Sequence, residues 1–529
     1  MLTFFVTIPI LIAVFLYLFP FKSMGRITSI VLQMGLFAAT VYLFIITRTE
    51  EIVSEIGGYG RLGITLRADA LSAAFILLTA FIFLMAAIYS YRNDKSKLFW
   101  FLFFIWQASL IGIFLSGDLF NIFVLMEVGT VVVSVLIMYN RKERSMYDGM
   151  IYLMINVVIM QFYLLGLGYV YSLVGVLDIG KAAEALAGLE AGQQILPYAL
   201  IITFVALKCA LVPVFSWLPK AHGTPGASGA VSAVLSGLHI KSALYLFIRF
   251  QDVFEVVAAT ELFIVVGIVT AVFGVVMSFS QTNIKLILAY STVAQVGLIV
   301  TGLSLGSYYS TVGGMYHMVT HAIFKTALFM GAGAIIRTYG TKDITQIRGV
   351  WKKMPLASCA MVLSILGIIG VPFFSGSVSK YFLSHGANGF LTIVIVVISL
   401  GTILIFLKFT TIFFGEPSEN AKTERVDYWQ VTPLWILGVL SLVFGVFGRR
   451  IIGVLFGMDV SVDLLGYVQK SGIFAVSFFV GYVAFKYYYK DYAWLKKARA
   501  FELGFRPMCA MIGVFFAVVV VWLLVKGAM

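Results

Sequence analysis

The chain has 529 residues, of which 61% are hydrophobic and only 12% are charged, and its mean hydropathy is +1.02. A soluble protein carries about a quarter charged residues, so this composition excludes a soluble globular protein and indicates one embedded in lipid. The formal net charge of +13 fits basic residues in short cytoplasmic loops better than it fits binding to nucleic acid.

About sixteen apolar runs follow one another along the chain, each close to 20 residues long and without the alternation of a barrel strand. They predict an all-α polytopic protein of the cell membrane. Basic residues gather in alternate links, such as Arg141, Lys142 and Arg144 after the fifth run, and Arg337 to Lys353 after the eleventh. The positive-inside rule therefore predicts that the odd-numbered links are cytoplasmic and that the N-terminus lies outside.

Two links carry more than a simple turn. Residues 48–69 are mixed in charge and half apolar, which predicts a small folded hairpin on the outer surface. The stretch KYYYKDYAWLKKAR at 486–499 is typical either of a cytoplasmic loop or of an interfacial amphipathic helix. The topology after about residue 430 stays open, including whether the last two runs both cross the membrane.

A short sequence recurs inside two apolar runs: VPVFS around Pro213 and VPFFS around Pro372. Proline interrupts the backbone hydrogen bonds of a helix, and an unwound segment persists inside a membrane only where protein or water satisfies it. Two broken helices at matching places are the sequence sign of a transporter with inverted repeats, whose site lies between the repeats.

Ionisable residues inside the apolar runs are the candidate functional groups, because a charge near the membrane centre costs roughly 2.5–3.5 kcal/mol. The candidates are Glu127, Lys208, Lys241, His317, His321, Lys325 and Lys380. Three of them, in HMVTHAIFKTALF, are spaced four residues apart and so share one helix face. Histidine titrates near neutral pH and passes protons between its two nitrogens, so the stripe predicts a segment of a proton pathway.

The first two candidates suggest a gate. A carboxylate close to a buried lysine favours the charged amine, so Lys208 would hold its proton while ionised Glu127 is near and release it otherwise. The alternative for these two residues is a buried ion pair with a purely structural role. Lys285 begins a helix, and its side chain could equally reach the membrane interface.

Metal and cofactor sites are not expected. His317 and His321 form an HxxxH pair, but no glutamate stands between them and Lys325 would repel a cation. Two histidines on one helix also cannot ligate opposite faces of a haem. The cysteines at 209, 359 and 509 are far apart and in no cluster-binding spacing, so we expect no cofactor in this chain.

The stretches LKCALVPVFSWLPKAHGTPG, QTNIKLILAYSTVAQVGL and HMVTHAIFKTALFMGAG resemble the antiporter-like, proton-conducting membrane subunits. That family includes the antiporter-like subunits of complex I, the Mrp-type cation/proton antiporter subunits and the matching subunits of membrane-bound hydrogenases. The resemblance runs from about Asp118 to Gly415. It implies a fourteen-helix core with two inverted five-helix repeats, each with one broken helix, to which about two C-terminal helices are added here.

Residue by residue, the resemblance implies a gate pair of Glu127 and Lys208 and a relay of lysines and histidines that ends at an uptake or release group, Lys380. The relay residues are Lys241, His317, His321 and Lys325. Asn283 and Leu286 depart from the Asp and Arg that usually flank the lysine at 285, which leaves the role of that lysine open.

The predicted division is N-terminal transmembrane helices at 1–97, a first antiporter repeat at 98–255, a second at 256–415 and C-terminal helices at 416–529. The predicted function is translocation of H⁺, alone or in exchange for Na⁺, by one subunit of a complex with other membrane subunits. Either redox chemistry elsewhere or an ion gradient would drive it. Two alternatives are a self-sufficient solute carrier and a helical scaffold that only anchors partners.

Overall fold

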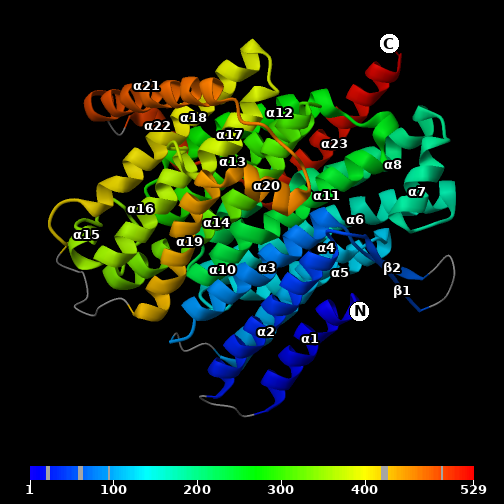
Figure 1. The fold of residues 1–529 in the computed structure, drawn as a ribbon, viewed down its shortest axis with the longest axis horizontal. Helices are drawn as coiled ribbons and strands as arrows, with labels where there is room; N and C mark the ends of the chain where they lie inside the picture. The colour runs from blue at the N-terminus through cyan, green and yellow to red at the C-terminus, as the bar shows by residue number, and fades with distance from the viewer. Residues whose placement is uncertain (20–23, 58–62, 93–95, 419–426, 490–491, 529) are drawn as a thin grey trace.

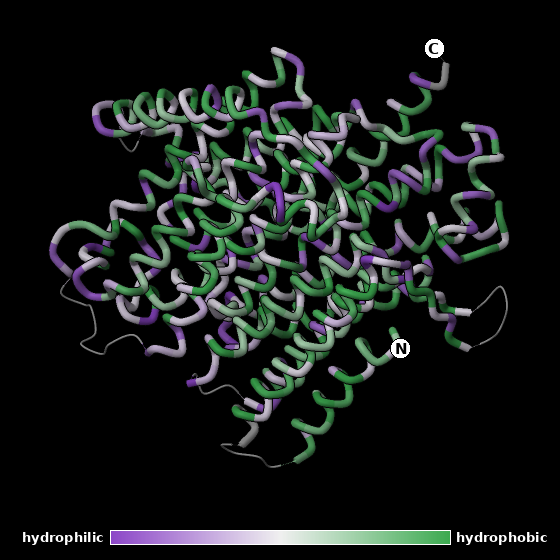
Figure 2. The backbone as a smooth tube through the Cα atoms, in the orientation of Figure 1, coloured by the Kyte–Doolittle hydropathy of each residue, from purple (hydrophilic) through white to green (hydrophobic). Residues whose placement is uncertain are grey.

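The computed structural model describes residues 1–19, 24–57, 63–92, 96–418, 427–489 and 492–528. Within these ranges, fourteen helices are long and apolar enough to cross a bilayer, and two apolar helices are shorter, at Thr3–Leu18 and Pro355–Ile369. The predicted all-α membrane fold is therefore confirmed. Hydrophobic residues run along the helices and hydrophilic ones gather mostly in the links (Figures 1 and 2).

The N-terminal part contains α1 (Thr3–Leu18), α2 (Met24–Ile46), β1 (Ile52–Ile56), β2 (Ile64–Ala68) and α3 (Ala70–Tyr89). The two strands pair antiparallel, with Ile52 opposite Ala68, so the predicted hairpin is present in the described part of residues 48–69. Residues 58–62 of this link lie outside the described residues. Asp69 begins α3 with a capping box: its carboxylate accepts from the Ser72 N–H.

The first repeat begins with three helices, α4 (Lys97–Leu115), α5 (Leu119–Ile137) and α6 (Glu143–Val174), and α7 (Ile179–Ala187) lies in the next link. It continues with a broken helix made of α8 (Ala191–Lys208) and α9 (Trp217–Gly223), and with a last span made of α10 (Gly229–Val234), the π-helical turn η2 (Leu235–His239) and α11 (Ile240–Val253).

The second repeat has the same order of elements. It contains α12 (Thr260–Ser280), α13 (Ile284–Ser304), α14 (Tyr308–Tyr339), the broken helix of α16 (Pro355–Ile369) and α17 (Ser375–His385), and α18 (Gly389–Thr410). Short helical turns η3 (Glu255–Val257), α15 (Val350–Lys353) and η4 (Thr411–Phe413) lie in the links. Backbone bridges join Asp118 to Asp178 before α5, and Asn283 to Asp343 before α13. These matching bridges lie on opposite faces, so the repeats are inverted.

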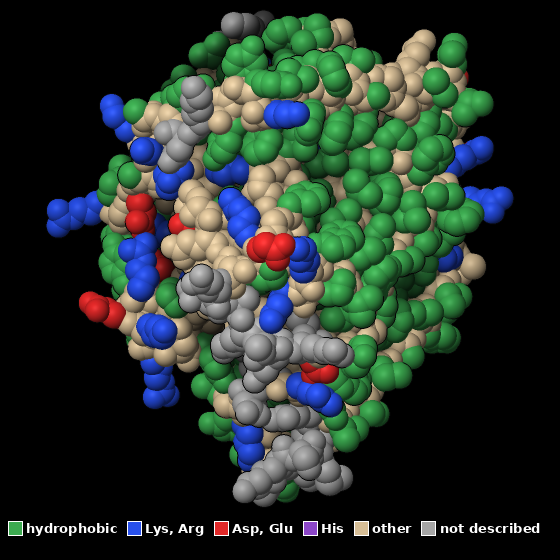
Figure 3. Space-filling view, turned by 90° about the vertical axis from the view of Figure 1, so that its left-hand side faces the viewer, with side chains coloured by type: hydrophobic (Ala, Val, Ile, Leu, Met, Phe, Trp, Pro, Cys, Tyr) green, Lys and Arg blue, Asp and Glu red, His purple; other side chains and the backbone are tan. Residues whose placement is uncertain are grey.

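The contacts between links divide the molecule into two faces. Lys342 in the link after the eleventh span donates to the Gly223 carbonyl after the seventh, at 3.0 Å. Arg249, at the end of the eighth span, pairs with Asp69, before the third. The links that follow odd-numbered spans lie together on one face, which we call the odd-numbered face. The links that follow even-numbered spans lie on the opposite one, the even-numbered face. The odd-numbered face, seen in Figure 3, carries more Lys and Arg than Asp and Glu, as the loop charges predict.

The C-terminal part contains α19 (Tyr428–Val446), α20 (Gly448–Phe456), α21 (Leu464–Tyr488), α22 (Ala493–Arg499) and α23 (Phe505–Ala528). α21 and α23 run in opposite directions between the two faces, and both are long and apolar enough to cross a membrane. α21 packs on α18 of the second repeat, α22 on α12, and α23 on α8 and α6 of the first repeat. We call residues 464–528 the C-terminal strap, because they join the outer sides of the two repeats (Figure 1).

Candidate functional site

The first break lies where the repeated motif predicts it. α8 ends at Lys208 and α9 begins at Trp217, and Ala210 between them is left-handed, with φ +56°. The break frees carbonyl groups at the end of α8. The Trp217 indole donates at 2.6 Å to one of them, the Leu207 carbonyl, which also accepts from the Ala210 N–H at 2.8 Å. A side chain of the second half-helix therefore satisfies the backbone of the first.

The Lys208 amine is held by neutral side chains. It donates to Thr130 Oγ1 of α5 at 2.9 Å and to Asn156 Oδ1 of α6 at 2.7 Å, and the residue is only 2% exposed. Glu127 lies one turn before Thr130 on α5 and is half-buried. Both are described residues, and no ion pair within 4.0 Å joins Glu127 to Lys208. The predicted gate residues Glu127 and Lys208 thus lie near one another, but the Lys208 amine donates its hydrogen bonds to a hydroxyl and an amide oxygen.

Lys241 stands just after a π-helical turn, a local widening that often marks a functional position. The widened turn leaves the Ser236 carbonyl accessible, and the Lys241 amine donates to it at 2.6 Å. The same amine is 2.5 Å from Nδ1 of His321. The structure therefore brings together two predicted relay residues from different repeats.

The stripe on α14 faces the interior along its whole length. His317 contacts Gln295 Oε1 through Nε2 at 2.9 Å and Ser379 Oγ through Nδ1 at 2.7 Å. Because the carbonyl oxygen of Gln295 only accepts, Nε2 carries a proton, while the serine hydroxyl can donate to Nδ1 or accept from it. His317 can therefore gain or lose a proton without losing either partner.

The other two stripe residues lie further toward the odd-numbered face. The ring centroids of His321 and His317 are 6.2 Å apart. Lys325 donates to the Leu288 carbonyl at 2.9 Å and also to the Ser291 hydroxyl. The stripe thus forms a continuous wall of protonatable groups, as its spacing predicts.

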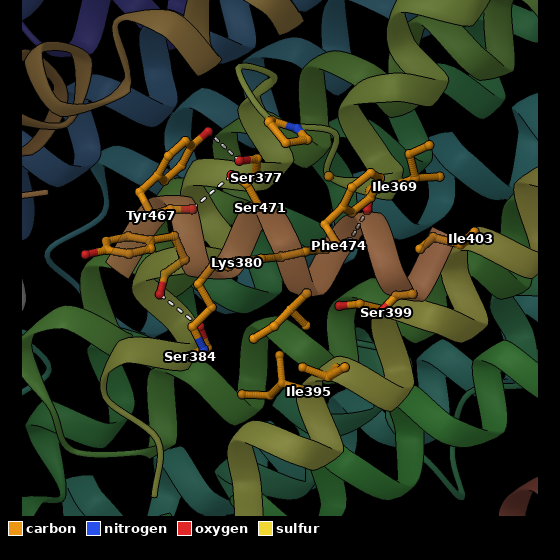
Figure 4. A pocket seen from close by; sticks show the side chains of 17 residues that line it. Ile369, Ser377, Lys380, Ser384, Ile395, Ser399, Ile403, Tyr467, Ser471 and Phe474 are labelled. Carbon is orange, nitrogen blue, oxygen red and sulfur yellow. Dashed lines mark hydrogen bonds between the residues drawn. The ribbon is translucent and has the colours of Figure 1, made fainter. Parts of the chain in front are cut away.

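The second break is held differently from the first. α16 ends at Ile369, and the left-handed Gly370 follows, with φ +87°. The Lys380 amine donates to the carbonyls of Ile368 and Ile369 at 3.1 and 3.2 Å. Lys380 also lines a cavity of about 80 Å³ between α17, α18 and α21 (Figure 4).

His239 is a buried residue that sequence reasoning missed. The Trp106 indole lies 3.4 Å from its Nδ1, and the Tyr152 hydroxyl lies 3.3 Å from its Nε2. Tyr152 belongs to the same helix as Asn156, which binds Lys208, and His239 is two residues before Lys241. The signal was present in the sequence, because SGLHIKS places a histidine and a lysine together in an apolar run.

These contacts define the interior polar path, a line of buried groups that crosses both repeats. Its buried members are Lys208, His239, Lys241, His321 and His317, it ends at the half-buried Lys380, and Lys325 forms a branch toward the odd-numbered face. Of the predicted site residues, Glu127 alone lies beside this path and not on it. Among the described residues, no group of three His, Cys, Asp or Glu side chains is placed to hold a metal ion.

Two residues near the branch are more deeply buried than the sequence suggests. Lys285 is 3% exposed and donates to the Ala227 carbonyl, so it does not extend to the membrane interface. His222, near the end of α9, is fully buried and stacks on Phe329 with ring centroids 4.4 Å apart. Both lie between Lys325 and the odd-numbered face.

On the odd-numbered face, the C-terminal strap contacts the first break. Glu502 pairs with Lys220 of α9 and, at 2.7 Å, with Arg144 of α6. Burial acts to raise the pKa of Glu502, but hydrogen bonds and the charges of these two cations outweigh it, so the pKa lies below its usual value. Glu502 is therefore an anion at neutral pH and ties the strap to the break.

Comparison with known proteins agrees with this architecture. The sequence profile described as NADH:quinone oxidoreductase/Mrp antiporter, TM, matches residues 116–406. The chain is 29% identical to the D-type subunit of the Na(+)/H(+) antiporter of Alkalihalophilus pseudofirmus over 83% of this chain and 91% of that protein. It is 31% identical to the N-type subunit of the NADH-quinone oxidoreductase of Desulforudis audaxviator over 74% of this chain and 83% of the other.

A solved structure has the same fold. A chain of the Mrp complex from Dietzia sp. DQ12-45-1b superposes with a TM-score of 0.79 and 25% sequence identity, covering 92% of this chain and 98% of the other. The profile match ends at residue 406, so the C-terminal strap lies outside it.

Proposed function

The chain belongs to the NADH:quinone oxidoreductase/Mrp antiporter family, and from that premise we propose that it translocates protons as one subunit of a larger membrane complex. The observation that carries the proposal is the interior polar path. Buried ionisable groups are costly inside a membrane and are retained where an ion or proton must pass. Here they follow one another from the first break to the second.

Proton transfer along the path needs groups that exchange protons over short distances. Lys241 and His321 are in direct contact, and His317 contacts Ser379 of α17, the helix that carries Lys380, so a bridging water would complete the step to that lysine. The longer step between the two histidines requires a bridging water or a turn of a ring. A neutral lysine at either end accepts a proton, and its ammonium form repels the next proton until it is passed on.

The remaining parts of the proposal concern the surroundings of the chain. The odd-numbered face is cytoplasmic and the N-terminus is outside, because the basic links follow the positive-inside rule. Partners are other membrane subunits, since the structural relative is part of a multi-subunit complex. The chain holds no cofactor of its own, and the energy comes from redox chemistry in a partner or from exchange for a cation such as Na⁺.

The proposal is tested with the complex purified gently from its native membrane and reconstituted in sealed vesicles. Lys325→Met should reduce proton translocation at least about tenfold, because it removes the proton-binding group of the branch that leads from the path to the odd-numbered face. Lys181→Met, on the surface helix α7, is the control and should transport normally. Normal transport by Lys325→Met would overturn the proposal, as would a solute flux catalysed by this chain without partners.

The same preparation identifies the driving force. Iron and flavin in stoichiometric amounts would mean that redox chemistry in a partner drives the path. A complex without them, whose proton flux depends on Na⁺, would mean cation exchange.

A further inference from the structure

α21 has an unusual surface for a helix so exposed. Of its residues Leu464–Tyr488, only Gly481 is buried. One stripe is nevertheless polar: Tyr467, Lys470, Ser471 and Ser477 recur at helical spacing. All of these side chains line the cavity that contains Lys380 (Figure 4). Lys470 lies in the second turn of α21, and it is on this inner stripe beside the cavity and not on the lipid-facing side.

The cavity is built from three elements around the second break. α17 contributes Ser377 and Lys380, α18 contributes Ser399, and α21 contributes its polar stripe. Figure 4 shows Tyr467, Ser471 and Phe474 of α21 on one side of the cavity and Ile395, Ser399 and Ile403 of α18 on another. Without α21, this side of Lys380 would face lipid.

α21 is fixed to the break itself. The Tyr467 hydroxyl lies 2.6 Å from Ser377 Oγ and accepts from the Phe373 N–H at 3.1 Å. Just before the helix, the Asp463 N–H donates to the Tyr381 hydroxyl at 3.2 Å. α21 starts on the even-numbered face, and α17 ends there at His385. The cavity therefore lies between Lys380 and the even-numbered face.

We propose that α21 completes an access cavity through which Lys380 exchanges protons with the even-numbered face, and that Lys470 is a second proton-binding group in this cavity. The inference rests on the proposed function. It assigns a role to a helix outside the matched family profile, which ends at residue 406.

The proton balance of this step is simple. An N–H bond of the Lys380 ammonium breaks, the proton binds the neutral amine of Lys470, and Lys470 releases it to water at the even-numbered face. Lys380 then regains a proton from the His317 side of the path. Two ammonium groups in one small cavity repel each other, so protonation of one favours release from the other. The other titratable groups facing the cavity are the phenols of Tyr381 and Tyr467, and its lining contains no carboxylate.

The cavity is tested first, by chemical labelling. Ser471→Cys is placed in a full-length chain whose native cysteines at 209, 359 and 509 are alanine, within the reconstituted complex. A charged thiol reagent is added to one side or the other of sealed vesicles. The reagent reacts with the cysteine thiolate, which forms only where the side chain meets water. Val476→Cys, exposed toward lipid on the same helix, is the matched control.

Ser471→Cys should react at least about tenfold faster than Val476→Cys, and only from the side of the even-numbered face. Equal, slow rates at both positions would overturn the access cavity, as would labelling from the odd-numbered side.

The role of Lys470 is tested by transport. Lys470→Met should lower proton translocation at least about fivefold and change its pH profile, while Lys486→Met, outside the cavity on the same helix, should change neither. Lys470→Arg separates charge from proton exchange, because arginine does not release its proton. We expect the arginine variant to fail as the methionine variant does; if it transports normally, Lys470 supplies only charge and the assignment is wrong.

The outcomes also separate the two proposals. Normal transport by Lys325→Met overturns the function itself. An inactive Lys325→Met together with a normal Lys470→Met overturns only the role of Lys470.

Discussion

At the first broken helix, the Leu207 carbonyl accepts hydrogen bonds from the Trp217 indole and from the Ala210 N–H. At the second, two freed carbonyls accept theirs from the ammonium of Lys380. The consequence concerns the lysines. The Lys208 amine donates to side chains of α5 and α6, so its environment changes whenever those helices move. Lys380 is bound to the backbone of its own break, so its proton exchange depends on access to the cavity.

The largest expected effect comes from removing either lysine. Lys208→Met and Lys380→Met should each reduce proton translocation at least about tenfold, because each removes one exchangeable proton site from a serial path. Proton flux in reconstituted vesicles measures this, with assembly checked by co-purification of the partners. A normal rate in either variant would mean that the corresponding break lies outside the path.

Trp217→Phe removes the indole donor, so the hydrogen bonding at the first break becomes more like that at the second. The Leu207 carbonyl loses the indole but keeps the Ala210 N–H as a donor, and a hydrogen bond of this kind contributes about 0.5–1.5 kcal/mol. The Lys208 amine then has a carbonyl to bind in place of Thr130 and Asn156. We expect a lower melting temperature and slower translocation, whereas Trp494→Phe, on an exposed position of α22, should change neither. An unchanged melting temperature would show that the indole bond does not stabilise the break.

Substitutions at the two left-handed residues of the breaks should change the stability by smaller amounts and in opposite directions. Ala210 has φ +56° and Gly370 has φ +87°. A side chain in the left-handed region costs roughly 1–2 kcal/mol. Ala210→Gly should therefore stabilise the protein slightly, and Gly370→Ala should destabilise it, as judged by thermal unfolding in detergent. A shift of the same sign in both variants would contradict the assigned backbone strain.

The smallest effect concerns the strap, which pairs through Glu502 with the first break. Because the pKa of Glu502 is lowered on folding, this pairing stabilises the strap above the usual carboxyl pKa of about 4.3 and is lost as the pH falls through the lower value. Glu502→Gln should therefore loosen α22 at pH 7 and differ little from the parent chain near pH 3.

The looseness of α22 is measured by the mobility of a spin label at Ala493→Cys, in a chain without native cysteines. Glu416→Gln removes a carboxylate that pairs with Lys352 on the same face and should leave the label unchanged. A label equally immobile at pH 7 with and without Glu502 would show that other contacts hold the strap.

Local patterns in the sequence predicted the fold well. Apolar runs indicated the spans, alternating basic links indicated the two faces, and the Val-Pro-X-Phe-Ser echo located both breaks. These features depend on neighbours within one segment, so no knowledge of packing was needed. The echo and the family resemblance both indicated inverted repeats, and the same order of elements, with a matching bridge before α5 and before α13, recurs in the two halves.

The partners of the candidate residues could not be predicted in the same way. Thr130 and Asn156 lie 78 and 52 residues from the lysine that they bind, and nothing in their own segments marks them. Glu127 was expected to face Lys208 because opposite charges attract, but packing gave the amine nearer oxygen acceptors. The inner stripe of α21 was missed because one lysine in an apolar run resembles an interface residue until the cavity beside it is known.

The C-terminal strap also implies an order of assembly. Its helices are synthesised after both repeats, so the spans that carry Lys208 and Lys380 enter the membrane before α21 and α23 can pack against them. During that interval the side of Lys380 that α21 later covers has no protein wall. Lys380 is thus shielded from lipid on this side only after α21 has packed. We expect that a chain lacking α21 would conduct protons without control.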